Sequence, residues 1–215
     1  MKKLLCMIMV LIMMAALIAG CGEQKKLLGS WEYTLELSDL IRQKLEEVAP
    51  EADFPVGDFA VTAQLTFEKD GTFVVQLDQN ELSAAVDALM AQLEDGLMEM
   101  LQSQLEEQGL TISVDELLAL SGLSQEELTE QLRQSFDADG FMEQLSDKAA
   151  LKGFYQVKGD KLLFCADAET KLDAVYTLYT VEENILTFHT HVGDNAFLQE
   201  NLILGAAPVE FTKVP

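Results

Sequence analysis

Basic side chains are scarce in this chain of 215 residues, which has 14 Lys and Arg against 37 Asp and Glu. The formal net charge is -23, and no cluster of Lys or Arg is present that could neutralise phosphate groups. A field of this sign repels nucleic acid and anionic headgroups. The composition therefore excludes nucleic acid as a partner.

Histidine is scarce as well, with only His189 and His191 in the chain. They lie two residues apart on a predicted strand, a spacing that zinc sites use, but a closed or catalytic zinc site needs three or four protein ligands. The alternating residues Leu186, Phe188 and Val192 are the better candidates for the interior face. We therefore predict no metal site, with His189 and His191 as the only weak candidates, no cofactor and no enzymatic activity.

The N-terminus has the parts of a secretory signal peptide: a basic start at residues 1–3 and an apolar run at residues 4–17. This run is shorter than the ~20 residues that a membrane-spanning helix needs. Ile18-Ala19-Gly20-Cys21 resembles the lipobox of bacterial lipoproteins, which implies cleavage after residue 20 and a lipid on Cys21. The alternative is an uncleaved N-terminal anchor with an ordinary cysteine at position 21.

The lipobox resemblance implies a signal peptide at residues 1–20 and a short lipidated tether at residues 21–27. It places the protein on the extracytoplasmic face of the cell membrane. Removal of the leader takes away two lysines and no acid, so the charge becomes -25. Cys165 is then the single unmodified cysteine, and stability must come from a hydrophobic core rather than from a disulfide.

Alternation of apolar and polar residues predicts eight short strands. The first starts at Trp31, and Ser38 can cap a short helix that ends at Pro50. Three hairpins follow, at residues 61–77, 154–165 and 175–192, and the last strand covers residues 209–213. Mostly sequential strands of this kind favour an antiparallel up-and-down barrel, which leaves no exposed edges.

Between the third and fourth strands the apolar spacing becomes helical, from Glu81 to Gln108, with Gly109 as the predicted C-terminal cap. Ser113 to Glu116 and Ser124 to Glu127 have the pattern of capping boxes, and each predicts the start of a shorter helix. Residues 79–150 are therefore a predicted helical subdomain inserted into the barrel of residues 28–215. Its Met and Leu stripes are core, or they form a groove that binds a partner helix.

Gly29-Ser30-Trp31 at the head of the first strand, followed by a meander whose hairpins carry Asp-Gly or Gly-Asp, resembles the lipocalin (calycin) group. With the lipobox and the helical insertion, the arrangement is similar to lipocalin-like lipoproteins of Gram-positive bacteria. The resemblance implies an eight-stranded barrel that binds or sequesters a small apolar molecule. Members of that group usually place an Arg on the last strand against this Trp; here the two arginines, Arg42 and Arg133, lie elsewhere, and Lys213 is the nearest substitute.

The sequence thus predicts an α+β protein, a lipocalin-like barrel with a helical insertion, that binds a small apolar ligand or a cell-envelope component. The predicted ligand-lining side chains are those that the two-residue period sends inward. They are Trp31, Tyr33, Leu65, Phe67, Phe73, Val75, Phe164 and Phe188. The alternative is a structural or protein-interaction module of the envelope that uses the helical insertion as its contact surface.

Overall fold

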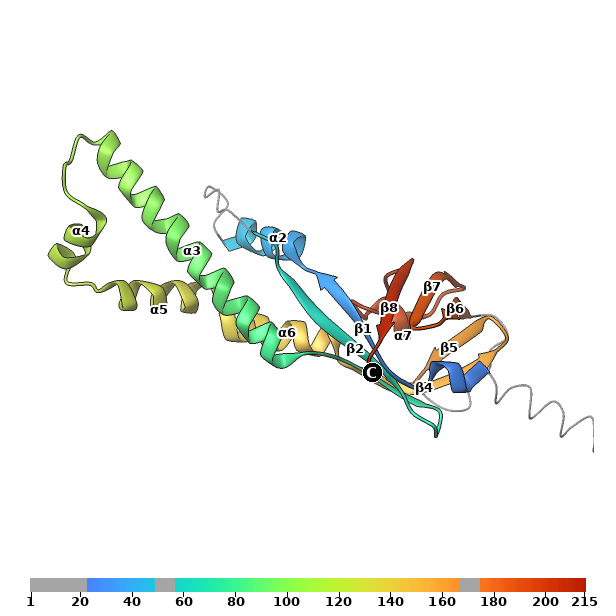
Figure 1. Cartoon of the computed structure of the whole chain (residues 1–215). Coiled ribbons are helices and arrows are strands. Elements are labelled where there is room, and N and C mark those ends of the chain that lie inside the picture. The colour runs from blue at the N-terminus through green and yellow to red at the C-terminus, as the bar shows by residue number, and fades with distance from the viewer. Residues whose placement is uncertain (1–22, 49–56, 167–174) are drawn as a thin grey trace, which may run out of the picture. The chain divides into compact units, whose positions relative to one another are not determined.

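The computed structural model describes residues 23–48, 57–166 and 175–215 (Figure 1). The predicted signal peptide, lipobox and Cys21 lie outside the described residues, as does Pro50, the predicted end of the first helix. The described residues fall into two compact units. We call them the barrel unit, within Met1–Tyr33, Ala63–Gln76 and Lys148–Pro215, and the helical unit, within Thr34–Thr62 and Leu77–Asp147.

Eight antiparallel strands close into a barrel in chain order, which confirms the predicted barrel and the position of the helical insertion between the third and fourth strands. The ring closes where β1 pairs with β8, with Trp31 opposite Lys213. A register shift between Leu178 and Tyr179 interrupts the pairing of β6 with β7. The strands are β1 (Gly29–Glu36), β2 (Ala60–Phe67), β3 (Thr72–Leu77), β4 (Leu151–Lys158), β5 (Lys161–Cys165), β6 (Tyr176–Glu182), β7 (Ile185–Val192) and β8 (Val209–Lys213).

The two-residue period decides which side chains of β2 and β3 face inward. Alternate apolar residues of both strands are buried, and the polar residues between them are partly or fully exposed. The turn that joins the strands ends at Gly71, whose φ of +86° lies in the left-handed region that glycine tolerates. The alternating pattern and the turn residues therefore both predict the hairpin of β2 and β3.

Residues 23–27 are helical and are fixed to the barrel, whereas the sequence predicted only a tether there. The Leu27 side chain is fully buried, and its carbonyl accepts a hydrogen bond of 2.6 Å from Trp31 Nε1. Gln24 Nε2 donates to the Tyr155 hydroxyl at 3.3 Å. Because a helix rises only ~1.5 Å per residue, this segment spans less distance than an extended tether of the same length.

Strand β5 is buried on both faces, which the sequence did not predict. The short helix α7 (Ala196–Gln199) packs against β5, and its Phe197 ring lies 6.2 Å from the inward-facing Phe73 ring. Gly153 makes room for this packing, because an added Cβ would meet the Phe197 ring and the Cys165 carbonyl. Because Gly153 lies opposite Phe73, this packing is on the inner face of the sheet and depends on a glycine in the neighbouring strand β4.

The helical unit begins with α2 (Ser38–Val48). Ser38 was predicted to cap this helix, and that prediction is wrong, because Ser38 is the first helical residue. Its hydroxyl accepts the Phe59 N–H at 2.8 Å, and the Leu37 N–H donates to the Phe59 carbonyl at 2.7 Å. These bonds join the start of α2 to the segment that leads into β2.

Four further helices follow: α3 (Gln79–Glu107), α4 (Val114–Ser121), α5 (Gln125–Phe136) and α6 (Ala138–Ala149). The first three were predicted as separate helices, whereas α6 was not. Both predicted capping boxes are present, with Ser113 and Ser124 accepting from the backbone of Glu116 and Glu127. Gly109 takes positive φ just beyond α3, as expected, and its N–H donates to Glu106 O. Local sequence therefore determines where these helices begin and end.

Polar contacts at one-turn intervals attach α5 to α3. Gln125 Nε2 and Thr129 Oγ1 each donate to the Glu94 carboxylate at 2.7 Å. Arg133 donates to Asp87 at 2.7 Å, and this bond raises the pKa of the guanidinium. Figure 1 shows α3 as the long helix from which α4 and α5 return. In the described part of the chain, each helix is too short or too polar to cross a bilayer.

Candidate functional site

The predicted ligand-lining side chains lie on the inner face of the barrel sheet. Trp31, Leu65, Phe67, Phe73, Val75, Phe164 and Phe188 are all buried. Tyr33 is only half-buried, and its ring lies 5.6 Å from that of Phe211. Seven of the eight side chains are therefore buried, and that they line a ligand site stays a prediction.

The aromatic rings in the barrel contact one another in a continuous series. Ring centroids are 5.0 Å apart for Phe211 and Phe188, and 5.7 Å apart for Phe188 and Phe164. Phe164 in turn lies 4.8 Å from Phe73 and 6.1 Å from Phe67. Spacings of 4.5–7 Å are those of directly packed aromatic pairs. The protein's own side chains thus occupy the interior along this series.

Sequence reasoning missed three inward aromatic residues: Phe211, Tyr155 and Tyr179, all of them buried. The Tyr155 hydroxyl donates to the Glu68 carbonyl at 2.9 Å, which places it beside the β2–β3 turn. The Tyr179 hydroxyl has no hydrogen-bond partner among the described residues, and burial raises its pKa to about 12. Phe154, which precedes Tyr155, is also aromatic, so the sequence does not show which of the two faces inward; the pairing of Tyr155 opposite Phe164 does.

A lysine of the last strand lies over the Trp31 ring. Lys213 Nζ lies 5.0 Å from the centre of the Trp31 ring, within the range of cation–π attraction. Trp31 lies opposite Lys213 in the sheet, so the contact sits at the seam that closes the barrel. The side-chain contact therefore reinforces the backbone closure.

The two histidines each have a hydroxyl partner on β6. His189 Nε2 lies 3.0 Å from Thr180 Oγ1, and His191 Nδ1 lies 2.8 Å from Thr177 Oγ1. Burial lowers the pKa of His191, and the carbonyls of Ala206 and Leu204 oppose this shift only in part. Within residues 23–48, 57–166 and 175–215, no group of three His, Cys, Asp or Glu could hold a metal ion.

Other predictions for this part of the sheet have mixed outcomes. Leu186 and Phe188 are buried, as predicted for the inner face of β7. Val192 is half-buried instead, so its predicted place in the interior is wrong. The register shift inserts His189 between the paired residues Phe188 and Thr190, which reverses the alternation beyond it. Cys165 is only 3% exposed, and its Sγ lies 3.4 Å from the Phe154 carbonyl. The thiol is packed as a small hydrophobic group.

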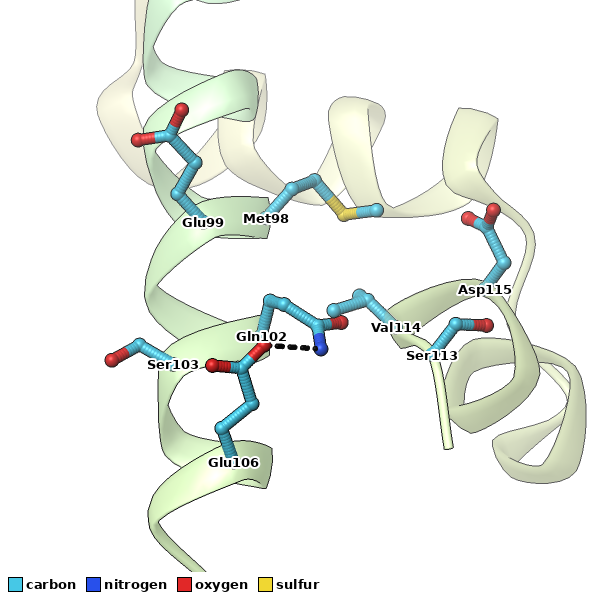
Figure 2. Close-up of a pocket in the computed structure, with 8 residues that line it drawn as sticks. All are labelled: Met98, Glu99, Gln102, Ser103, Glu106, Ser113, Val114 and Asp115. Carbon is cyan, nitrogen blue, oxygen red and sulfur yellow. Dashed lines mark hydrogen bonds between the residues drawn. The ribbon is translucent and has the colours of Figure 1, made fainter. Parts of the chain in front are cut away.

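A groove of about 470 Å³ opens in the helical unit between α3 and α4 (Figure 2). Met98 and Gln102 of α3 and Val114 of α4 project into it, and Gln102 Nε2 donates to Glu106 at 3.1 Å. Val114 also belongs to a small hydrophobic cluster with Leu105 and Leu118. The groove therefore has an apolar floor and a polar rim.

Comparisons of the chain with protein-family models, with curated proteins and with solved structures found no match. A function must therefore be proposed from the geometry of the chain's own residues.

Negative charge surrounds the groove. Glu99, Glu106 and Asp115 line it, and residues 70–132 contain no Lys or Arg at all. The next base, Arg133, is already paired with Asp87. Glu106 and Glu107 occupy the last turn of α3, where the helix macrodipole favours cations. This end of the helical unit is therefore an uncompensated anionic surface around an apolar floor.

Proposed function

We propose that this chain is a lipid-anchored extracytoplasmic lipoprotein with a lipocalin-like barrel as its structural body. In this proposal the helical unit is the surface that contacts a component of the cell envelope. The observation that carries the proposal is the series of touching aromatic rings from Phe211 to Phe67, which occupies the space that a carried ligand would need. An eight-stranded barrel is just wide enough either to be filled by side chains or to hold one small ligand.

Exposed apolar side chains support the helical unit as the contact surface. Leu120 of α4 is 77% exposed, Leu110 is 46% exposed and Met100 is 37% exposed, and all three lie in or beside the α3–α4 region. Single exposed apolar residues are normal, but a group of them beside a groove is typical of interaction surfaces. The barrel unit also exposes two large apolar side chains, Val74 at 37% and Ile185 at 38%, but they lie on the separate strands β3 and β7.

The anchor is proposed from the lipobox and from the segment that follows it. The helix at residues 23–27 begins two positions after Cys21 in the sequence and is fixed to the barrel through buried Leu27. A lipid on Cys21 would therefore hold the barrel close to the membrane surface. Two or more acyl chains are needed for stable attachment, since a single chain binds only marginally.

The second candidate is the binding of a small apolar molecule inside the barrel, lined by the side chains from Trp31 to Phe188 named above. One observation favours it: the buried Tyr179 hydroxyl has no partner among the described residues, and a buried polar group without a partner is costly. A ligand with a polar head could satisfy this hydroxyl next to Tyr155.

Native mass spectrometry of the full chain, purified from membranes in mild detergent, separates the two candidates. A filled barrel predicts the mass of the lipidated chain alone, unchanged by extraction with organic solvent. A carrier predicts about one equivalent of an apolar molecule that solvent removes. Recovery of such a molecule, followed by its stoichiometric rebinding, would refute the filled-barrel proposal and support the second candidate.

A further inference from the structure

The groove between α3 and α4 combines two properties that few chemical classes of partner match. Its floor presents the thioether of Met98 and the side chain of Val114, and its rim carries Glu99, Glu106 and Asp115 (Figure 2). Half-buried Leu101 and Leu117 pack on the same hydrophobic cluster, so the apolar floor is continuous with the core of this end of the unit. A bound partner must therefore bring both apolar surface and positive charge.

The chain itself supplies no positive charge at this end of the unit. Residues 70–132 lack Lys and Arg, and the single base in α5 is committed to Asp87. The acidic last turn of α3 is unfavourable for that helix in isolation, because carboxylates there face the negative end of the helix dipole. A cation brought by a partner would relieve this repulsion and gain attraction from the rim.

We infer that the groove binds a basic amphipathic segment of another envelope protein, one whose apolar side chain enters between Met98 and Val114 while its Lys or Arg residues meet the rim carboxylates. The inference rests on the proposed function and specifies its partner. Met98 and Glu106 are eight residues apart on α3, about 12 Å at 1.5 Å per residue, which matches roughly two turns of a bound helix. Methionine suits such a floor, since its flexible thioether adapts to different apolar side chains.

The test uses the full-length chain in an uncharged detergent and three synthetic peptides of about 15 residues, a length at which helices become stable enough to form. The first peptide is an amphipathic helix of Leu, Lys and Ala, and the second has Glu in place of Lys. The third keeps the lysines but replaces every Leu with Gln. Fluorescence anisotropy of labelled peptide reports the binding. We expect only the first peptide to bind, and its affinity to fall as salt rises from about 0.1 M to about 1 M.

Variants of the chain then assign the binding to the groove. The triple variant Glu99→Gln, Glu106→Gln, Asp115→Asn should weaken binding about tenfold, since each rim pair contributes a modest amount and the three add. The control Glu46→Gln, Glu47→Gln, Glu143→Gln removes the same charge from exposed sites on α2 and α6 and should change the affinity less than about twofold. Met98→Ala, checked for intact helicity by circular dichroism, should weaken binding while leaving its salt dependence unchanged.

Three results would overturn the inference. Equal binding of the leucine-free peptide would mean that charge alone is recognised, and equal loss in the control variant would mean that the groove is not the site. Failure of every peptide to bind, together with self-association of the chain that the groove variants abolish, would make a second copy the occupant. None of these results concerns the barrel, so each would refute the groove inference alone. The proposed function fails by a different result, an apolar ligand found in the barrel by mass spectrometry.

Discussion

Truncation of Phe164 to alanine is the sharpest perturbation of the barrel interior. Its ring contacts those of Phe73, Phe67 and Phe188, and its side chain is buried. Burial of a phenylalanine, together with the cavity left behind, makes Phe→Ala changes cost about 3 to 5 kcal/mol. Because three packed ring pairs are lost at once, we expect a value of about 4 kcal/mol, near the middle of that range.

A loss of this size should lower the melting temperature by about 8 to 16 °C, at about 2 to 4 °C per kcal/mol for a chain of this length. The chain should still fold, since domains are stable by about 5 to 15 kcal/mol. Fluorescence of Trp31, the only tryptophan, reports on the barrel during thermal or denaturant unfolding. The control is Phe154→Ala on the neighbouring strand, where the side chain is half-exposed and the expected cost is about 1 to 2 kcal/mol.

The same variant tests whether the lumen is filled. Removal of the Phe164 ring should leave a dry apolar cavity between Phe67, Phe73 and Phe188, and such cavities bind benzene or xenon. The Phe164→Ala protein should therefore be stabilised by benzene, whereas the unmodified chain should not. The reasoning is refuted if Phe164→Ala costs less than about 1 kcal/mol, or if the unmodified chain already binds apolar probes stoichiometrically in the barrel.

Three further predictions concern the anchor, the helices and the response to pH. Cys21→Ser should abolish lipid labelling and processing at this site while Cys165→Ser leaves both intact, and labelling that persists in Cys21→Ser would remove the basis for the anchor. Ser113→Ala and Ser124→Ala should each destabilise their helix by about 1 kcal/mol, seen as faster amide exchange in α4 and α5, with Ser103→Ala near the C-terminal end of α3 as the control. Burial lowers the pKa of His191 below its ordinary value of 6.5, so the folded state binds fewer protons than the unfolded state and loses stability as pH falls through and below 6.5. The His191→Gln variant should lack this contribution to the pH dependence. The unfolding free energies of the variant and the unmodified chain, measured between about pH 7.5 and 5.5, should therefore differ by an amount that changes with pH.

Local chemistry explains why most of the fold was predictable. The strands of the barrel carry a two-residue period, and each turn has its own residues, such as Gly71 with positive φ. The capping boxes at Ser113 and Ser124 are complete within four residues, so nothing distant is needed to form them. These features were predicted correctly because the residues that form each of them are close together in the sequence.

Features that depend on distant partners were not predictable in this way. Ser38 has the composition of a helix cap, but its hydroxyl is taken by the Phe59 N–H, which lies 21 residues away in the chain. Asn201 caps the turn that follows α7 and also donates to the Ala149 carbonyl, a contact across 52 residues. Neither partner can be inferred from spacing, and the packing of α7 against β5 was missed for the same reason.

The groove was predictable only in part. The Met and Leu stripes of the insertion were recognised as core or as a partner groove, and Leu105 and Leu118 do form a small core with Val114. What the periodicity could not show is which stripe residues stay accessible, because that depends on how α4 returns against α3. The absence of bases from residues 70–132, in contrast, is visible in the sequence and could have indicated an anionic surface.

Site-specific photo-crosslinking in intact cells tests the central claim most directly. A photoreactive residue is placed in turn at Leu120 and Leu110 in the helical unit, and at Val74 and Ile185, which are the exposed large apolar residues in the described part of the barrel. The account predicts one discrete crosslinked species from the helical positions, none from the barrel positions, and loss of that species in the Glu99→Gln, Glu106→Gln, Asp115→Asn variant. Crosslinks from Val74 or Ile185 with none from Leu120 and Leu110 would contradict it.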